Sequence, residues 1–467
     1  HLGYHTTGFY GCQVFFLDNF IFSIFSLHTT PSYVYIVTEH NFYRKDFTMK
    51  KAVGIIAEYN PFHKGHAYHI EKAKELTGAD YAVVVLSGDF VQRGTPAVFS
   101  KHLRTKMALL GGADVVLELP SYYASSSAEY FAKGSIGILN ALHGIDFLCF
   151  GSESGELSPC MATAEILSKE PEAFQISLKE NLKKGLSFPS ARKAALLEYG
   201  AKFLSGPWNN EFLDTPNNIL GVEYCKALLS LKSSIRPVTL KREGSAYHAE
   251  KLENSYPSAS AVRRSLSQLQ DTDSREFLPA LLSLFTRTQP EMVASLPHNL
   301  TKEDMMTEDD FSLLLKYKLM RSTPDSLCQY ADMSPELARR ICNRLNEFMS
   351  FSQFAGLLKT KELTRTRINR ALLHTLLEIP ADLPSHAPGY VRLLGFQKKS
   401  SEFLRLLQNN STIPVLTKAA DYKKRLPKEE ISAFETDIFV SNLYQSVLHI
   451  KKQTAFVHDL QKPPVLL

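Results

Sequence analysis

Cysteine is scarce and irregularly placed in this chain. Its six cysteines form no CxxC pair and show no regular spacing; they are Cys12, Cys149, Cys160, Cys225, Cys328 and Cys342. This argues against a disulfide scaffold and against a zinc site built from paired thiolates. Cysteine usage of this kind is typical of a protein in a reducing cytoplasm. The chain also lacks internal repeats and low-complexity tracts.

The N-terminal segment has neither a signal peptide nor a membrane-spanning run. The apolar stretch from Val14 to Leu27 is interrupted by Asp18 and Asn19 and is too short to cross a bilayer. It has no basic region before it and no small-residue cleavage site. We predict that the native chain begins at Met49 and that residues 1–48, which start with His1, are a disordered, non-native leader. A membrane-associating segment is the alternative.

The bulk composition is that of a folded globular protein. Hydrophobic residues make up 44% and charged residues 22% of the 467 positions, and the net charge is only +5. A charge this small fits a nucleic-acid partner but also fits many metabolic enzymes. The length is sufficient for two or three domains.

Apolar strands and amphipathic helices alternate from Met49 onward. Buried strands are predicted at 52–57, 81–86, 113–120, 145–151 and 236–240, with helices at 66–76, 100–110 and 128–142 and a helical insert at 159–199. This alternation predicts an α/β fold with a Rossmann-like, doubly wound parallel sheet. Beyond about residue 270 the predicted elements are helices, at 311–320, 334–349 and 431–450. The predicted domains are therefore a catalytic domain at 49–270 and a mainly α-helical domain at 271–467.

A histidine motif follows the first strand. The chain turns at Asn60-Pro61 and continues through His63, Lys64, Gly65 and His66 into a helix. Ligands bind at the carboxyl ends of parallel strands, and a helix N-terminus there favours phosphate. His63 and His66 are therefore predicted to be catalytic donors to phosphate oxygens. A metal site formed with His69, or unconnected surface histidines, are the alternatives.

A second motif supports the phosphate interpretation. Ser258 and Ser260 precede Arg263 at the predicted start of a helix, where hydroxyls, backbone amides and a guanidinium could hold a triphosphate. Together the two motifs resemble the HxGH nucleotidyltransferase superfamily. That superfamily has a hydroxyl residue at the position of Ala259, so this contact is in question.

Several further segments narrow the resemblance to the bacterial tRNA(Met) cytidine acetate ligase family. These are residues 54–63, 87–94, 101–108, 150–153 and 216–221. Lys64 occupies a position where the family often has Asn. The resemblance implies an enzyme that condenses acetate with ATP to acetyl-adenylate, and then acetylates N4 of the wobble cytidine of elongator tRNA(Met).

The resemblance also implies a nucleotide site. Its residues would be Ile56, Ala57, Glu58, Tyr59, Asn60, Pro61, Phe62, His63, Lys64, Gly65, His66, Ala67, Tyr68, His69, Gly151, Asn217 or Asn218, and Arg242. ATP is expected together with Mg²⁺, without a metal held by protein residues, a protein partner or a membrane. The location is expected to be cytoplasmic.

Basic residues of the C-terminal half are candidates for tRNA contacts. From Ala331 to the end there are 20 lysines and arginines against 13 aspartates and glutamates. A cluster within this region and two residues of the catalytic domain are predicted to bind phosphate or RNA: Lys359, Lys361, Arg365, Arg367, Arg370, Arg93 and Lys101. If the cluster is helical, Lys361 and Arg365 share one face. A solvated helix face is the alternative. Two other functions stay open: an HxGH enzyme for a phosphorylated metabolite, and a non-catalytic RNA-binding protein.

Overall fold

The computed structural model describes residues 12–17, 20–25, 34–38, 41–45, 50–203, 210–242, 259–269, 300–384 and 386–467. It divides into two units, His1–Lys51 and Ala52–Leu467. The first unit contains an antiparallel sheet in the order β1-β2-β3-β4, with the strands Cys12–Leu17, Phe20–Phe25, Val34–Thr38 and Asn41–Lys45. These strands differ from the disorder predicted for residues 1–48. The rest of that segment, and Met49, lie outside the described residues.

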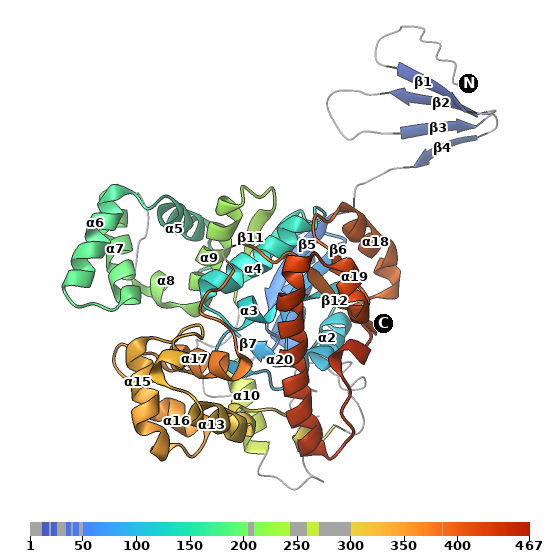
Figure 1. The fold of residues 1–467 in the computed structure, drawn as a ribbon. Helices are drawn as coiled ribbons and strands as arrows, with labels where there is room; N and C mark the ends of the chain where they lie inside the picture. The colour runs from blue at the N-terminus through green and yellow to red at the C-terminus, as the bar shows by residue number, and fades with distance from the viewer. Residues whose placement is uncertain are drawn as a thin grey trace. The chain divides into compact units, whose positions relative to one another are not determined.

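The second unit is built on a sheet of eight strands (Figure 1). The strand order is β11-β10-β5-β6-β9-β12-β13, and β14 pairs with β12. Five strands lie where the sequence predicts them: β5 (Ala52–Ala57), β6 (Tyr81–Ser87), β9 (Val115–Leu119), β10 (Phe147–Ser152) and β11 (Arg236–Lys241). All of these pair in parallel. The predicted α/β class with a doubly wound sheet is confirmed.

The side chains of the central strand β6 alternate between two hydrophobic cores, which explains why helices cover both faces of the sheet. In β6, Val83 and Val85 belong to one hydrophobic core, and Val84 and Leu86 belong to a second core on the other side. A strand buried on both faces has to be apolar throughout. The first core contains residues of α4 (Ala128–Ala141), α5 (Leu157–Lys169), α9 (Pro216–Ser230) and α18 (Ser401–Asn410). The second contains residues of α1 (Lys64–Thr77), α2 (Lys101–Leu110) and α10 (Ala259–Leu269).

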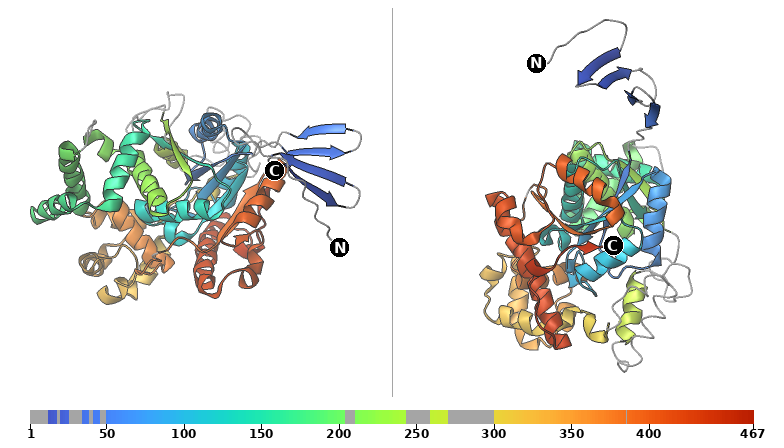
Figure 2. Two further views of the ribbon diagram at one scale, coloured as in Figure 1. Left: turned by 90° about the horizontal axis from the view of Figure 1, so that it is seen from above. Right: turned by 90° about the vertical axis from the view of Figure 1, so that its right-hand side faces the viewer.

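The helical insert extends from the sheet on the side of α9 (Figures 1 and 2). Its further helices are α6 (Glu172–Lys183), α7 (Phe188–Phe203) and α8 (Asn210–Asp214). Helix α3 (Ser121–Ala124) and the two-stranded hairpin of β7 (Phe90–Val91) and β8 (Thr95–Pro96) complete this half of the chain. The hairpin matters for the site because its turn carries Gln92 and Arg93.

The C-terminal part is mainly helical, as the sequence predicts, but it also contributes three strands to the central sheet. Strand β12 (Val391–Phe396) pairs antiparallel with β9, and β13 (Val415–Leu416) and β14 (Val465–Leu466) pair with β12. These strands complete the central sheet, so part of the 271–467 segment folds together with the predicted 49–270 domain. The predicted boundary near residue 270 lies outside the described residues.

A third core lies among helices of the C-terminal part. It contains residues of α13 (Ser312–Met320), α14 (Pro324–Leu327), α15 (Pro335–Arg344), α16 (Phe351–Leu357) and α17 (Arg365–Leu377). The long helix α20 (Lys428–Lys452) adds Tyr444 to it, and Phe90 of β7 belongs to the same core. Helix α19 (Tyr422–Arg425) and the start of α20 pack in a small fourth core. The described residues contain no helix long and apolar enough to cross a membrane.

Candidate active site

The site lies where the strand order of the sheet changes direction. From β5 the chain proceeds through α1 to β6 on one side, whereas β10 pairs with the opposite edge of β5. Helices leaving β5 and β10 therefore diverge, and a crevice opens at the carboxyl ends of these strands. A pocket of about 450 Å³ occupies it. Its walls include thirteen of the predicted residues: Ile56, Ala57, Glu58, Tyr59, Asn60, His63, His66, His69, Arg93, Gly151, Asn217, Arg242 and Arg263.

The HxGH segment forms the first turn of α1. His63 is the N-cap, with extended backbone, and its Nδ1 accepts a hydrogen bond from the Gly65 N–H at 3.1 Å. The Nδ1 of His66 in turn accepts from the His63 N–H at 3.2 Å. The two rings stack with centroids 3.7 Å apart. Because each Nδ1 accepts from the backbone, the proton of each neutral imidazole is on Nε2. The cap thus makes both rings Nε2–H donors.

Burial keeps these histidines neutral. Burial, together with the charges of Arg242 and Arg263, lowers the pKa of His63 to about 3. Burial also lowers the pKa of His69 to about 4 and that of His66 well below its ordinary value. Among the described residues, no group hydrogen-bonds to the buried Nε2 atoms of His63 and His69. Such atoms are costly unless a ligand binds them. In the described part of the chain, no three histidine, cysteine or acidic side chains converge as a metal site.

The loop between β5 and α1 is held from several sides. Tyr59 has a φ of 46°, and the Asn60–Pro61 peptide is cis. The Oδ1 of Asn60 accepts from the Val98 N–H at 2.8 Å, and the Oε1 of Glu58 accepts from the Gln92 N–H at 3.0 Å. These bonds fix the pocket-lining loop to the β7–β8 hairpin.

Arg104 is a positioning residue that the sequence analysis did not single out. It is fully buried in α2, and its guanidinium donates to the carbonyls of Glu58, Ser87, Gly88 and Phe99. Burial lowers its pKa. One side chain thereby joins the carboxyl ends of β5 and β6 just below the pocket. In the sequence, the one indication that Arg104 matters was its place in segment 101–108, which resembles the family.

The side of the pocket beside Gly151 and Asn217 is ordered by Glu153. Its Oε1 accepts from Asn217 Nδ2 at 2.6 Å, and its Oε2 accepts from the Asn218 N–H at 3.0 Å. Asn218 is buried, and its Oδ1 accepts from the Glu153 N–H at 3.0 Å. Asn217 therefore faces the pocket, whereas Asn218 braces the loop. A Cβ on Gly151 would lie 3.2 Å from Arg242 Cγ, so glycine lets that arginine cross the end of β10.

Arg263 enters the pocket from α10. Its Nη1 donates to the Asn60 carbonyl at 2.7 Å, which ties the second motif to the HxGH loop. Ser258 lies outside the described residues, and the side chain of Ser260 does as well. The predicted hydroxyl contacts of this motif therefore stay predictions.

Some predicted nucleotide-site residues do not line the pocket. Pro61 and Phe62 are buried beneath it, Lys64 is exposed, and Gly65, Ala67, Tyr68 and Asn218 do not reach its walls. Conversely, nine lining residues were not predicted. Some of them lie in the segments that carry the family resemblance: Gln92, Phe150, Pro216, Ile219 and Leu220. The others lie outside those segments: Ala128, Phe131, Tyr224 and Thr366. Thr366 comes from the first turn of α17, more than three hundred residues along the chain. It lies within the basic cluster singled out in the sequence, but the local pattern does not indicate that it reaches this pocket.

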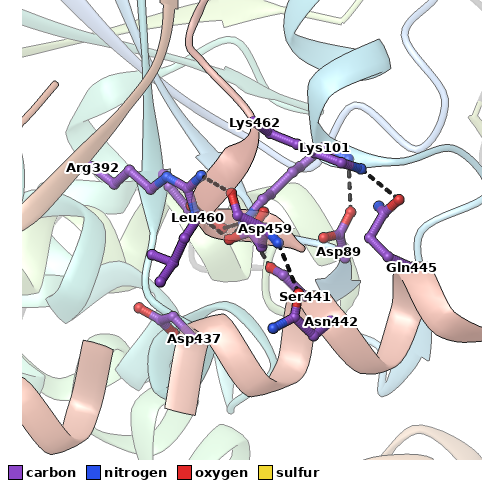
Figure 3. A network of polar contacts seen from close by, with 12 residues as sticks. Asp89, Lys101, Arg392, Asp437, Ser441, Asn442, Gln445, Asp459, Leu460 and Lys462 are labelled. Carbon is purple, nitrogen blue, oxygen red and sulfur yellow. Dashed lines mark hydrogen bonds and ion pairs between the residues drawn. The ribbon is translucent and has the colours of Figure 1, made fainter. Parts of the chain in front are cut away.

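The prediction that Lys101 contacts RNA is wrong for this structure. The side chain is fully buried, and its Nζ donates to Glu118 Oε1 at 2.7 Å, Ser441 Oγ at 2.6 Å and Asp459 Oδ2 at 3.3 Å. Burial opposes its charge, but Asp459 and Glu118 outweigh this and raise its pKa. Arg392 also pairs with Asp459 (Figure 3). Lys101 is thus the centre of an ion network that joins α2, β9, α20 and the C-terminal segment.

The cations near α17 fall into two groups. The helix begins at Arg365, with Thr364 as N-cap, so Lys361 precedes it and the predicted shared face does not exist. Arg365 donates to the Ser352 carbonyl at 2.6 Å, and Arg370 forms two bonds to Asp332 at 2.8 and 3.0 Å. These contacts hold both arginines against the helical cluster. The exposed members are Lys359, Lys361 and Arg367.

Fold and site together define a nucleotidyltransferase of the HIGH type. The family model described as HIGH Nucleotidyl Transferase matches residues 49–458. The chain is 37% identical over 399 residues to a tRNA(Met) cytidine acetate ligase of Acetivibrio thermocellus, covering 84% of this chain and 94% of the relative. It is 39% identical over 399 residues to the protein of the same name from Clostridium perfringens, with the same coverage.

Two solved structures also resemble this chain. The crystal structure of Thermotoga maritima TmcAL bound with alpha-thio ATP superposes with a TM-score of 0.79 at 30% identity, covering 89% of this chain and 99% of that one. The apo structure of the same protein gives a TM-score of 0.81. The chain therefore belongs to the tRNA(Met) cytidine acetate ligase family. The family resemblance seen in the sequence is confirmed.

Proposed function

We propose that this protein is an ATP-dependent ligase that acetylates N4 of the wobble cytidine in elongator tRNA(Met). In the first step, an acetate oxygen attacks the α-phosphorus of ATP, and the bond to pyrophosphate breaks. In the second step, cytidine N4 attacks the acetyl carbonyl of acetyl-adenylate. The new C–N bond forms as the bond to AMP breaks, and N4 loses a proton to solvent.

The observation that carries this proposal is the set of neutral histidine donors at the crevice. Nε2–H groups of His63 and His66 would donate to phosphate oxygens, whose negative charge grows as pyrophosphate leaves. The guanidinium groups of Arg242 and Arg263 would neutralise the remaining charge. A relative that binds an ATP analogue supports the same assignment.

Adenosine would lie beside Gly151 and Asn217. Mg²⁺ usually binds through substrate phosphates and one or two carboxylates. Glu58 is the acidic residue among the described pocket walls, so it fits such an ion. The metal would neutralise pyrophosphate as it departs.

The tRNA would approach from the side of the helical cluster. Lys359, Lys361 and Arg367 are exposed near the start of α17, and Thr366 of the same helix lines the pocket. Recognition of a folded RNA relies mainly on its backbone, while an unstacked loop base can enter a protein pocket. A tRNA substrate implies a cytoplasmic protein.

Acetate-dependent exchange of pyrophosphate into ATP tests the first step. The purified protein should catalyse it with a divalent cation and without acetyl-CoA. Mass spectrometry of nucleosides from treated tRNA(Met) then tests the second step, with N4-acetylcytidine as the expected product. Exchange that needs no carboxylate would instead indicate a nucleotidyltransferase for another substrate, and acetylation that requires acetyl-CoA would contradict the proposed activation.

A further inference from the structure

A second pocket, of about 380 Å³, adjoins the nucleotide pocket. The two pockets share the side chains of Asn60, Arg93, Arg263 and Thr366. A group bound in the second pocket would therefore lie across these shared side chains from the site proposed for acetyl-adenylate. This adjacency is what an acceptor for the acetyl group requires.

Close backbone contacts fix the walls of this second pocket. Gly94, in the turn of the β7–β8 hairpin, has a φ of 74°, and a Cβ there would lie 2.4 Å from the backbone nitrogen of Arg370. The hairpin is thus packed directly on α17. The Met306 N–H donates to the Val98 carbonyl at 2.9 Å and holds the segment before α13 against the same hairpin. The pocket is therefore a built feature of the fold.

The lining combines an apolar wall with hydrogen-bond donors. Pro96, Val98, Leu266 and Met305 supply the apolar part. Asn369 of α17 is 6% exposed, and its Oδ1 accepts from Arg365 Nε at 3.2 Å. That bond orients the amide so that both Nδ2 hydrogens are presented as donors. A planar ring with acceptors on one edge complements these features.

We propose that the second pocket receives the target cytosine of the RNA, with Asn369 as a specificity-determining residue. This inference rests on the proposed function. The faces of the base would lie against the apolar wall, and its O2 and N3 acceptors would accept from Asn369 Nδ2. N4 would then remain for attack on the acetyl carbonyl. Uracil carries an N–H donor at N3. This donor would face the Asn369 Nδ2 donor, so no hydrogen bond would form between them.

Two substitutions and one control test this assignment. Asn369→Asp keeps the shape and the bond from Arg365 but replaces the donors with an acceptor. Thr95→Phe fills the second pocket from β8 without touching the nucleotide pocket, which Thr95 does not line. Asn409→Asp makes the same chemical change at an exposed position on α18 and should behave like the wild-type protein.

Each protein is assayed for acetate-dependent pyrophosphate exchange and for acetylation of tRNA(Met). Both pocket variants should keep wild-type exchange, while their kcat/KM for tRNA acetylation falls about 10- to 100-fold. Wild-type acetylation in both variants would overturn the assignment, as would a parallel loss of exchange in Thr95→Phe. If Asn369→Asp does not fold, Thr95→Phe decides alone. Absence of acetate-dependent exchange in the wild-type protein would identify failure of the proposed function itself, and the inference would fall with it.

Discussion

His63 has two separable roles, because one ring nitrogen caps α1 and the other faces the pocket. The Nδ1 accepts from the Gly65 N–H, whereas the buried Nε2 has no partner among the described residues. Asn is among the best N-cap residues, so His63→Asn should preserve the cap and remove only the pocket donor. His63→Ala removes both.

The expected magnitudes follow from these contacts. Loss of the cap costs about 0.5–2 kcal/mol of stability, so His63→Ala should be less stable by that amount and His63→Asn close to wild type. Loss of a pre-placed donor to developing charge typically slows the reaction about 10²–10³-fold, or about 2.7–4 kcal/mol. Both variants should therefore lose exchange activity to the same degree.

Urea denaturation and the rate of pyrophosphate exchange measure the two roles independently. His143→Asn makes the same chemical change at an exposed residue before β10, with a φ of 46° that Asn tolerates. It should alter neither quantity. Near-native turnover of His63→Asn would refute the assignment of Nε2 as a donor to phosphate. Equal destabilisation of both His63 variants would refute the capping argument.

Three further predictions follow from the described contacts. The exposed cations near α17 are Lys359, Lys361 and Arg367. Reversing their charges should weaken tRNA binding and reduce its salt dependence without changing the rate of pyrophosphate exchange. An unchanged tRNA affinity would mean that the RNA binds to another surface. Lys101→Met should destabilise the fold by about 3–5 kcal/mol in urea melts, because the two buried carboxylates of Glu118 and Asp459 would then have Arg392 as their cation in place of two cations. A stability equal to wild type would contradict this. In the unfolded chain, histidines take up protons below about pH 6.5, whereas His63, His66 and His69 stay neutral in the folded protein. Stability should therefore fall as the pH drops from about 6.5 toward 3, and a flat profile would contradict their lowered pKa values.

The sequence by itself determined the first half of the fold and the core of the site. Strands such as β6 are apolar throughout, and the helices between them are amphipathic, so each element is encoded in a local pattern. The HxGH segment directly follows one of these strands, and its place at a strand end predicts the crevice. His63 and His66 could be assigned for this reason.

Only the tertiary structure decided the features that depend on contacts between segments far apart in the sequence. Strand β12 is a short, mostly apolar segment within a helix-rich region, and its pairing with β9, β13 and β14 makes it a strand. Lys101 resembles any surface lysine until α2, β9 and the C-terminal segment place Glu118 and Asp459 around it. Thr366 and Asn369 reach the two pockets because the Gly94 turn packs on α17. Local sequence patterns report burial and helical period, but they carry no information on which remote segment supplies the other side of a contact.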